Sequence, residues 1–206
     1  MPDVRLPGYV WDSRLRGGRF RSVYEDGRLG RIVAARDIVQ QLRTLTERSG
    51  RLFANLAEDA FTGRITAADF QRALMGELRA LYNANSALAV GGWQRMGPAE
   101  WGRNGGLLRE EYRHLAGFVQ ELADGKLSLA EARARAQLYA DNAYARYWQE
   151  DLRLKQEAGL KEEHLITMGD DRVCVICRGA ERQGYVPLGT FGIPLHIGCR
   201  CEKAYR

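Results

Sequence analysis

The sequence lacks the features that mark membrane-spanning and secreted proteins. No run of apolar residues in the 206-residue chain approaches the roughly 18 to 20 that are needed to cross a bilayer. The first residues contain no apolar core of the kind that a secretory signal carries. We therefore expect no membrane partner and no classical secretion. With 45% hydrophobic and 28% charged residues, the chain has the composition of one or two ordinary globular domains.

Cysteine is absent from the first 173 residues, and all four cysteines lie between Cys174 and Cys201. This clustering indicates a site near the C-terminus rather than a framework of disulfides. The sequence also contains no glycine-rich phosphate loop, no H-E-x-x-H motif and no G-x-S-x-G motif. The cysteine cluster is therefore the main candidate for chemistry.

Lysine is scarce, since only four of the 31 basic residues are lysine and the others are arginine. Arginine favours bidentate contacts to phosphate or carboxylate, although a GC-rich genome produces the same bias. The net charge of +5 comprises +3 over residues 1–31, −2 over 32–171 and +4 over 172–206. Basic ends around a nearly neutral middle suit contact with an acidic protein or a nucleic acid.

Residues 1–33 are rich in arginine and glycine and show no sustained helical period. We interpret them as an irregular arm with room for one short hairpin. The arm carries the aromatic residues Tyr9, Trp11, Phe20 and Tyr24. Because aromatic side chains supply large contact areas, the arm is expected either to dock on a partner or to fold back over the chain's own helices.

Residues 34–166 are predicted to form a bundle of about four long helices, because apolar residues recur there at helical spacing. The first helix begins near residue 34, and the second ends at Gly91, where glycine can adopt the left-handed conformation. The third opens at Pro98 and the fourth after Ser128. The expected apolar positions are Ile38, Leu42, Leu45, Leu52, Leu56, Phe70, Leu74, Leu78, Leu81, Leu88, Leu108, Tyr112, Leu115, Val119, Leu122, Leu138, Ala145, Trp148 and Leu152.

Two connections between these helices resemble each other. Residues 62–69 and 124–131 share a glycine, a base, an aliphatic residue, a hydroxyl and an acid three residues later, at an offset of 62 residues. The hydroxyl residues Thr66 and Ser128 can cap the helices that follow, and the acids stand at the third helical position of a capping box. The pattern indicates two similar αα-hairpins packed as a four-helix bundle.

Residues 167–206 are rich in glycine and proline and have short β-type stretches without a helical period. They are predicted to form a small, separate, β-rich module. So few residues cannot build a sufficient hydrophobic core, and modules of this size usually need disulfides or a metal.

The cysteines of this tail have metal-ligand spacing: Cys174-x2-Cys177, eighteen residues, then His196-x2-Cys199-x-Cys201. A Cys-x2-Cys knuckle places two thiolates on one metal, and a second pair beyond a hairpin completes the tetrahedron of a structural zinc site. Zinc needs four of the five candidates, and we predict Cys174, Cys177 and His196 with either Cys199 or Cys201. The alternatives are two disulfides or free thiols without a metal. A nucleophilic cysteine beside His196 would have no evident third orienting residue.

The remaining candidates carry less chemistry. His114 is expected on the surface of the third helix, and His164 in the linker between bundle and tail. Asp170 and Asp171 are expected to cap or orient the tail rather than to bind a metal. An aromatic stripe on the fourth helix is attributed to the bundle core or to an arm-docking face. It comprises Tyr139, Tyr144, Tyr147 and Trp148.

The residues around the cysteines follow a recognisable order. Residues 169–177, 184–189 and 194–201 read GDDRVCVIC, GYVPLG and PLHIGCRC. An aspartate before C-x2-C, followed by a proline, a histidine and C-R-C, resembles the C-terminal signature of tailed-phage minor head proteins, the Mu F-like head morphogenesis family. The helical region and residues 18–22 are also similar to the shorter members. Residues 197 and 198 are Ile-Gly where many members have a Pro-Asn type pair, which leaves the fourth ligand open.

The resemblance implies a structural protein and no enzyme. Such a protein is present in few copies inside the capsid, with the portal protein and capsid components as partners, and assembly as a ring or in several copies on the portal is compatible with it. The location implied is the virion, with the host cytoplasm during assembly. The arginine-rich ends would then contact packaged DNA through phosphates without reading its sequence.

Two other classes of function stay open. A zinc-ribbon regulator would bind DNA or protein through the tail, and it would keep a sequence preference as salt rises. An HNH-like nuclease also frames its site with C-x2-C knuckles, but it needs a catalytic histidine besides the structural ligands. His196 is the sole histidine of residues 167–206, so zinc ligation would leave no base to activate water.

Overall fold

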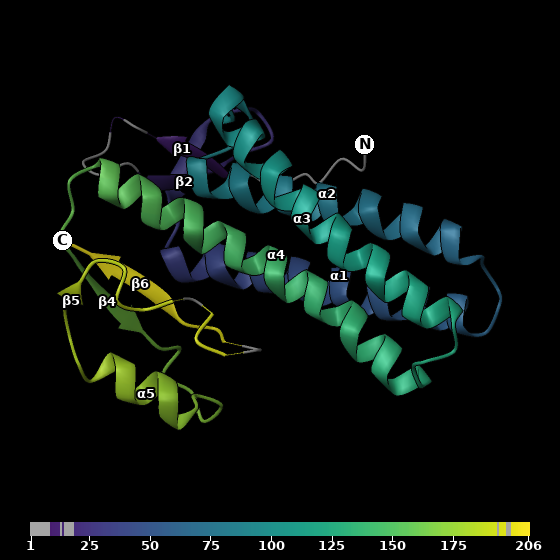
Figure 1. Ribbon diagram of the computed structural model, residues 1–206. Helices are drawn as coiled ribbons and strands as arrows, with labels where there is room; N and C mark the ends of the chain where they lie inside the picture. Colours follow the sequence, from purple (N-terminus) through teal and green to yellow (C-terminus); the bar gives the residue numbers. More distant parts are fainter. Residues whose placement is uncertain (1–8, 13, 15–18, 193, 197–198) are drawn as a thin grey trace.

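The computed structural model describes residues 9–12, 14, 19–192, 194–196 and 199–206 of the chain. Its main body is a bundle of four long helices, with two small antiparallel sheets at one end (Figure 1). The helices are α1 (Ala35–Phe61), α2 (Ala67–Val90), α3 (Pro98–Ala123) and α4 (Leu129–Glu157). The predicted fold class, mainly α with a four-helix bundle, is confirmed. Among the described helices, none combines the length and apolar character that crossing a membrane requires.

The long helices begin and end where their sequence dictates. The Thr66 hydroxyl accepts a hydrogen bond from the backbone amide three residues on, and Ser128 forms a full capping box with Glu131. Pro98 is the first residue of α3, where its missing N–H costs nothing. Gly91 ends α2 with a φ of 94°, a left-handed conformation that a side chain would strain. These boundaries agree with the sequence prediction.

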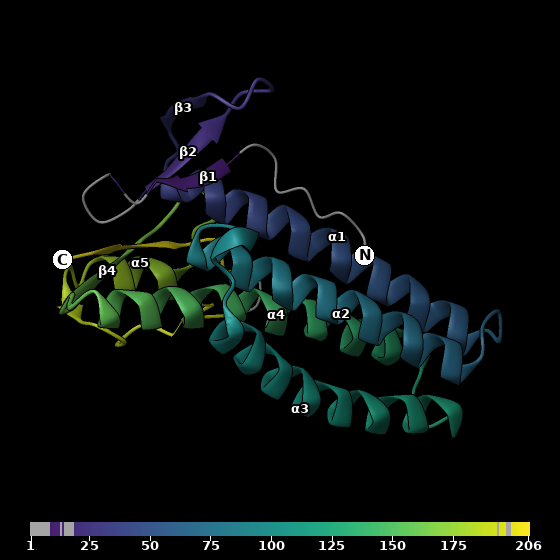
Figure 2. The ribbon, with the colours of Figure 1, turned by 90° about the horizontal axis from the view of Figure 1, so that it is seen from above.

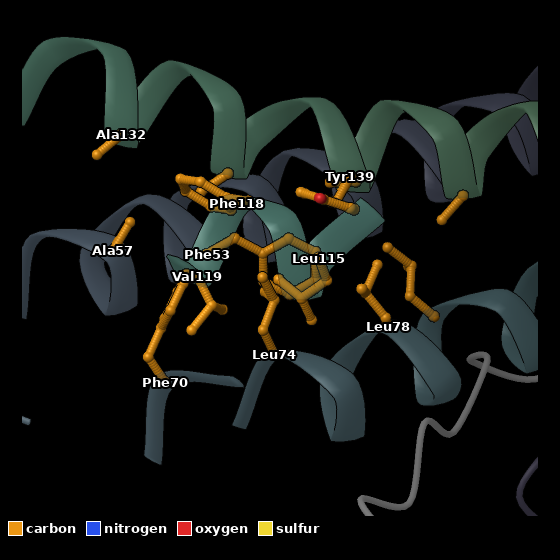
Figure 3. Close-up of a cluster of buried hydrophobic side chains, with 14 of the residues drawn as sticks. Phe53, Ala57, Phe70, Leu74, Leu78, Leu115, Phe118, Val119, Ala132 and Tyr139 are labelled. Atoms are coloured by element: carbon orange, nitrogen blue, oxygen red, sulfur yellow. The ribbon is translucent and has the colours of Figure 1, made fainter. Parts of the chain in front are cut away.

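One core fills the half of the bundle near the α1–α2 and α3–α4 connections, and we name it the distal core (Figure 3). The Phe70 and Phe118 rings meet edge to face at 5.6 Å, and Phe118 stacks on Tyr139 at 6.2 Å. Its buried members are Phe53, Ala57, Phe70, Leu74, Leu78, Leu81, Tyr82, Leu108, Leu115, Phe118, Val119, Leu122, Ala132, Ala136, Tyr139, Ala140 and Ala143.

The prediction was wrong at two of the apolar positions. Leu52 and Leu138 are 41% and 43% exposed, so both lie on the surface. On α4 the inward positions are taken by Tyr139 and by the small residues Ala132 and Ala136, which let α1 and α2 approach α4 closely. An apolar residue is not needed at 138 because the neighbouring tyrosine fills that layer.

The tail contains a sheet that begins earlier than residue 167. The strand β4 (Glu162–Ile166) is the central strand, between β5 (Val186–Pro187) and β6 (Glu202–Tyr205), and α5 (Val175–Glu181) lies on the side away from α4 (Figure 1). The predicted boundary after residue 166 would therefore cut the central strand from its sheet. The side chains of Glu163 and Leu165 point to the buried side of β4. His164, which was expected in a linker, lies within this strand.

A second core joins the tail and the arm to the bundle, and we name it the junction core. Its buried members are Val33, Ile38, Val39, Leu42, Leu88, Ala89, Tyr144, Tyr147, Trp148, Leu165, Cys177, Ala180, Phe191, Cys199 and Cys201. Tyr9 and Phe20 of the arm pack against it. The tail thus shares this core with α1 and α4, which complete the burial of its apolar side chains.

The arm is a three-stranded antiparallel sheet and not an irregular segment with one hairpin (Figure 2). Its strands, in the order β1-β2-β3, are β1 (Tyr9–Asp12), β2 (Arg19–Val23) and β3 (Leu29–Ile32). The strands are too short for a clear alternating pattern, which explains the missed prediction. Of the two alternatives for the arm, the described residues show it folded back over the chain's own helices. Residues 1–8 lie outside the described residues.

A buried polar layer lies within the bundle and was not predicted. The Glu150 carboxylate, fully buried on α4, accepts hydrogen bonds from Arg146 (2.5 Å), Arg103 (2.9 Å) and Arg153 (2.5 Å). Arg146 Nε in turn donates to Asn104 Oδ1 at 2.9 Å. Every oxygen of the buried carboxylate is therefore satisfied, as a buried charge requires.

Candidate metal centre

The Cys-x2-Cys segment is built into the start of α5. Cys174 is the N-cap of this helix, and its sulfur accepts a hydrogen bond from the backbone amide of Cys177 at 3.3 Å. The helical turn places both thiols on one side, with Cys177 buried and Cys174 half-buried. The knuckle geometry thus follows from an ordinary capping interaction.

His196 approaches both thiols of the knuckle. Its Nε2 atom lies 3.1 Å from Cys174 Sγ and 3.2 Å from Cys177 Sγ. The Cys199 amide donates to the His196 carbonyl, and the Cys199 sulfur lies 4.0 Å from Cys177 Sγ. Cys201 completes a second group, because the ligand atoms of Cys177, Cys199 and Cys201 lie within 4.8 Å of one another, as do those of Cys174, Cys177 and His196.

The five residues that the sequence singled out are therefore brought together, and they could bind a metal ion. Cys177 belongs to both groups and lies at the centre of the cluster. The sulfur-to-sulfur distance of 4.0 Å is about twice the roughly 2.05 Å of a disulfide bond, and all four cysteines are free thiols.

The donor atoms fit an ion of the size of zinc. Zn–S bonds of about 2.3 Å and Zn–N bonds of about 2.0 Å in a tetrahedron place the ligand atoms roughly 3.5 to 3.8 Å apart. The separations of 3.1, 3.2 and 4.0 Å bracket that range. Cys174, Cys177, His196 and Cys201 also line a small cavity of about 20 Å³. A single water needs on the order of 10 to 15 Å³, so one small ion can be accommodated.

The protons of the cluster are unevenly shared. The hydrogen bond from Cys201 lowers the pKa of Cys199 to about 5, whereas burial raises the pKa of Cys177 to about 12. The pKa of Cys201 is raised by the same hydrogen bond to Cys199, and the Cys177 amide lowers the pKa of Cys174. A metal that binds Cys177, or any other thiol whose pKa is raised, would have to displace the proton of that thiol. Metal binding should therefore weaken as the pH falls.

An ion pair holds the two ends of the cluster together. Arg200, between Cys199 and Cys201, donates from Nη1 and Nη2 to the two oxygens of Asp170 at 2.7 and 2.6 Å. The guanidinium lowers the pKa of Asp170, which keeps the carboxylate charged. Such bidentate pairs fix geometry as well as supply energy. Asp170 therefore orients the tail, as its sequence position indicated.

A second ion pair beneath the cluster was missed by the sequence analysis. Lys203 Nζ donates to Glu163 Oε2 at 2.8 Å and to the Phe191 carbonyl at 2.6 Å, and the Phe191 amide donates to Glu163 Oε1 at 2.6 Å. Glu163 and Lys203 are buried on β4 and β6. Together they hold the backbone of Phe191, a member of the junction core. Glu163 stands between Glu162 and His164, and Lys203 follows Glu202, so nothing in the sequence shows that these two charges face inward.

The other candidate residues named from the sequence do not belong to the cysteine and histidine cluster. His114 is exposed on α3, as predicted. His164 Nε2 lies 3.0 Å from the Glu181 carbonyl, and its ring faces Tyr185. The aromatic stripe of α4 is core: Tyr139 is in the distal core, and Tyr144, Tyr147 and Trp148 are in the junction core.

Comparison of the chain with family models, with curated proteins and with solved structures finds no match. Function is therefore inferred from the chemistry of the cluster and from the resemblance of its residues to the signature described above.

Proposed function

We propose that the chain is a structural minor head protein of a tailed phage or prophage, and that one structural zinc ion holds its C-terminal end. The observation that supports this most is the grouping of the signature residues. Cys174, Cys177, His196 and the C-R-C segment lie together, and the aspartate of the signature pairs with its arginine. Residues that are spread over 32 positions of the sequence thus lie together at one site.

In this proposal zinc is bound by Cys174, Cys177 and His196 with either Cys199 or Cys201. The ion supplies a cross-link and a charge that stabilises thiolates, and it takes part in no reaction. It ties α5 to the segment before β6, and Cys177, Cys199 and Cys201 of these two parts belong to the junction core. The zinc would therefore cross-link the part of the tail that packs into this core.

The partners in this proposal are the portal protein and capsid components. The four-helix bundle provides a rigid body for docking, and several copies or a ring would sit on the portal inside the capsid. Arg28 and Arg31 of the arm and Arg172 of the tail are exposed and suit non-specific contact with packaged DNA. The protein would be in the host cytoplasm during assembly and in the virion afterwards.

The test is to express the chain with the portal protein encoded in the same genome and to isolate the portal rings. The proposal expects the chain to copurify with the rings at a fixed ratio, and to be found by mass spectrometry in purified heads. Its absence from both would contradict the proposal. A rigid-body complex should survive moderate salt, whereas a contact made only through DNA should be lost with nuclease treatment.

A zinc-ribbon regulator is the second candidate, favoured by the exposed arginines of α5. The HNH-like nuclease has less support. His164 is engaged by the Glu181 carbonyl, and among the described residues no histidine other than His196 belongs to the cluster. With His196 bound to zinc, no general base would remain to activate water, so we propose no enzymatic activity.

A further inference from the structure

The short helix α5 has one buried side and one side that nothing in the described chain covers. Cys177 and Ala180 face inward and belong to the junction core. Val175 and Ile176, between the two knuckle cysteines, are 83% and 58% exposed. A side chain built on Gly179 would meet no atom within 4 Å. Two β-branched apolar side chains are thus presented to solvent on a rigid helix.

The same side of α5 carries positive charge. Val175, Arg178, Gly179 and Arg182 stand at the helical spacing of three, four and seven residues, so they share one face. Arg178 and Arg182 are exposed and have no ion pair among the described residues, although Arg178 Nε donates to the Val173 carbonyl at 3.1 Å. We name Val175, Ile176, Arg178, Gly179 and Arg182 the α5 outer face.

The fold itself does not require this composition. The knuckle needs two residues between its cysteines, but it does not need them to be apolar. β-Branched residues are poorer helix formers than the polar residues usual at exposed positions. Their large exposure next to two exposed arginines without a carboxylate partner therefore points to contact with another molecule.

We propose that the α5 outer face is a docking site for an acidic protein segment that presents an apolar side chain beside its carboxylates. Apolar anchors at the centre with arginine at the rim are the usual composition of a protein interface. A phosphate backbone would match the arginines, but it would leave the two apolar side chains without a partner. This proposal goes beyond the phage assignment, because it depends only on exposure and charge.

The experiment uses the full zinc-loaded chain and two fluorescent peptides. Both peptides form one amphipathic helix with a leucine stripe, which is flanked by glutamates in one and by lysines in the other. Fluorescence anisotropy should show the glutamate peptide binding about tenfold more tightly than the lysine peptide, since like charges repel. The double change Val175→Ser with Ile176→Ser should weaken glutamate-peptide binding by about tenfold.

The charge reversal Arg178→Glu with Arg182→Glu keeps the apolar residues and should invert the preference between the two peptides. Leu138→Ser and Arg109→Glu, which change an exposed leucine on α4 and an exposed arginine on α3, are matched controls and should leave binding unchanged. Zinc content verifies that each variant is folded. Because the reversed residues lie outside the cluster, this variant remains informative if the serine variant fails to hold zinc.

Two results would overturn the proposal. One is failure of the zinc-loaded wild type to prefer the glutamate peptide. The other is binding of a short DNA duplex that requires Arg178 and Arg182 but is unaffected by the serine changes, which would make the face a phosphate-binding surface.

Discussion

The two cores of this protein differ in what holds them together. The distal core consists of aliphatic and aromatic side chains from all four long helices. The junction core contains three buried thiols. Among the described residues around this core, four buried side-chain atoms have no hydrogen-bond partner. They are Tyr144 Oη, Trp148 Nε1, and Nε and Nη1 of Arg43. The distal core is held by hydrophobic burial, whereas the junction core also contains thiols that a metal can cross-link.

This difference predicts uneven stability along the molecule. The distal half should keep its structure when the metal is removed, while the tail and the adjacent ends of α1 and α4 should open locally. The changes below test that contrast, in order of decreasing effect.

Removing the central thiol should have the largest effect. Cys177 belongs to both ligand groups, so Cys177→Ser should abolish stoichiometric zinc binding and unfold the tail. Hydrogen exchange should become fast from Glu162 onward and remain slow in the distal core. Cys199→Ser and Cys201→Ser serve as controls, because one of them should retain zinc. Retention of full zinc by Cys177→Ser would contradict the proposed ligand set.

Emptying the distal core should have the next largest effect, and it should spare the metal. Phe118→Ala removes a fully buried ring that contacts Phe70 and Tyr139, and it should lower the free energy of unfolding by about 3 to 5 kcal/mol. Urea unfolding measures the loss. Phe61→Ala, at an exposed position of α1, should change stability by less than about 0.5 kcal/mol. Loss of zinc from native Phe118→Ala would show that the two cores are not independent.

The buried polar layer should contribute about as much as a small core residue, and its contribution should depend on pH. Glu150→Gln leaves three arginines without their carboxylate and should cost about 3 kcal/mol at neutral pH. Burial would raise the pKa of Glu150, but hydrogen bonds from Arg153 and Arg103 and the charge of Arg146 lower it below the ordinary 4.5.

The stabilisation by Glu150 is therefore present above pH 4.5 and is lost as the pH falls through the lowered value. The free energies of unfolding in urea of wild type and Glu150→Gln should converge in acid. Glu157→Gln is the control on the same helix, where the ion pair with Arg153 is exposed and worth little. A difference in the free energy of unfolding between wild type and Glu150→Gln that stays constant across this pH range would contradict the role assigned to Glu150.

The ion pair that flanks the cluster should have the smallest effect of the four. Asp170→Asn removes the charge that Arg200 binds, and it should weaken zinc affinity by about tenfold without unfolding the protein. A chelator competition assay measures the affinity. Asp171→Asn is the neighbouring exposed control and should bind zinc as the wild type does. Equal affinities for the two variants would show that Asp170 does not position the ligands.

Local signals in the sequence were sufficient for the helices and for the grouping of the ligands. Helix boundaries are marked by local interactions of Thr66, Ser128, Pro98 and Gly91 with residues a few positions away. They can therefore be predicted without knowledge of the tertiary structure. The five candidate ligands have a spacing typical of structural zinc sites. The grouping of Cys174, Cys177, His196, Cys199 and Cys201 was therefore predicted without knowledge of the tertiary structure.

The features that were missed depend on distant partners. β4 pairs with β6, whose residues lie about forty positions later, and a five-residue strand has no period of its own. From the sequence alone, Glu163 and Lys203 are expected on the surface, but in the sheet of β4 and β6 both side chains are buried. The charges of Arg146 and Glu150 also read as a solvated face of α4, because the packing of α2 and α3 that buries them is not local.

The most direct test of a zinc-held tail is the intact mass of the untagged protein under native and denaturing conditions. The account predicts one zinc per chain, lost on denaturation, after which all four cysteines can be alkylated. A native mass with no metal, together with a denatured mass showing two disulfides, would contradict it. The junction core would then be held by covalent bonds, and the contrast between the two cores would have a different cause.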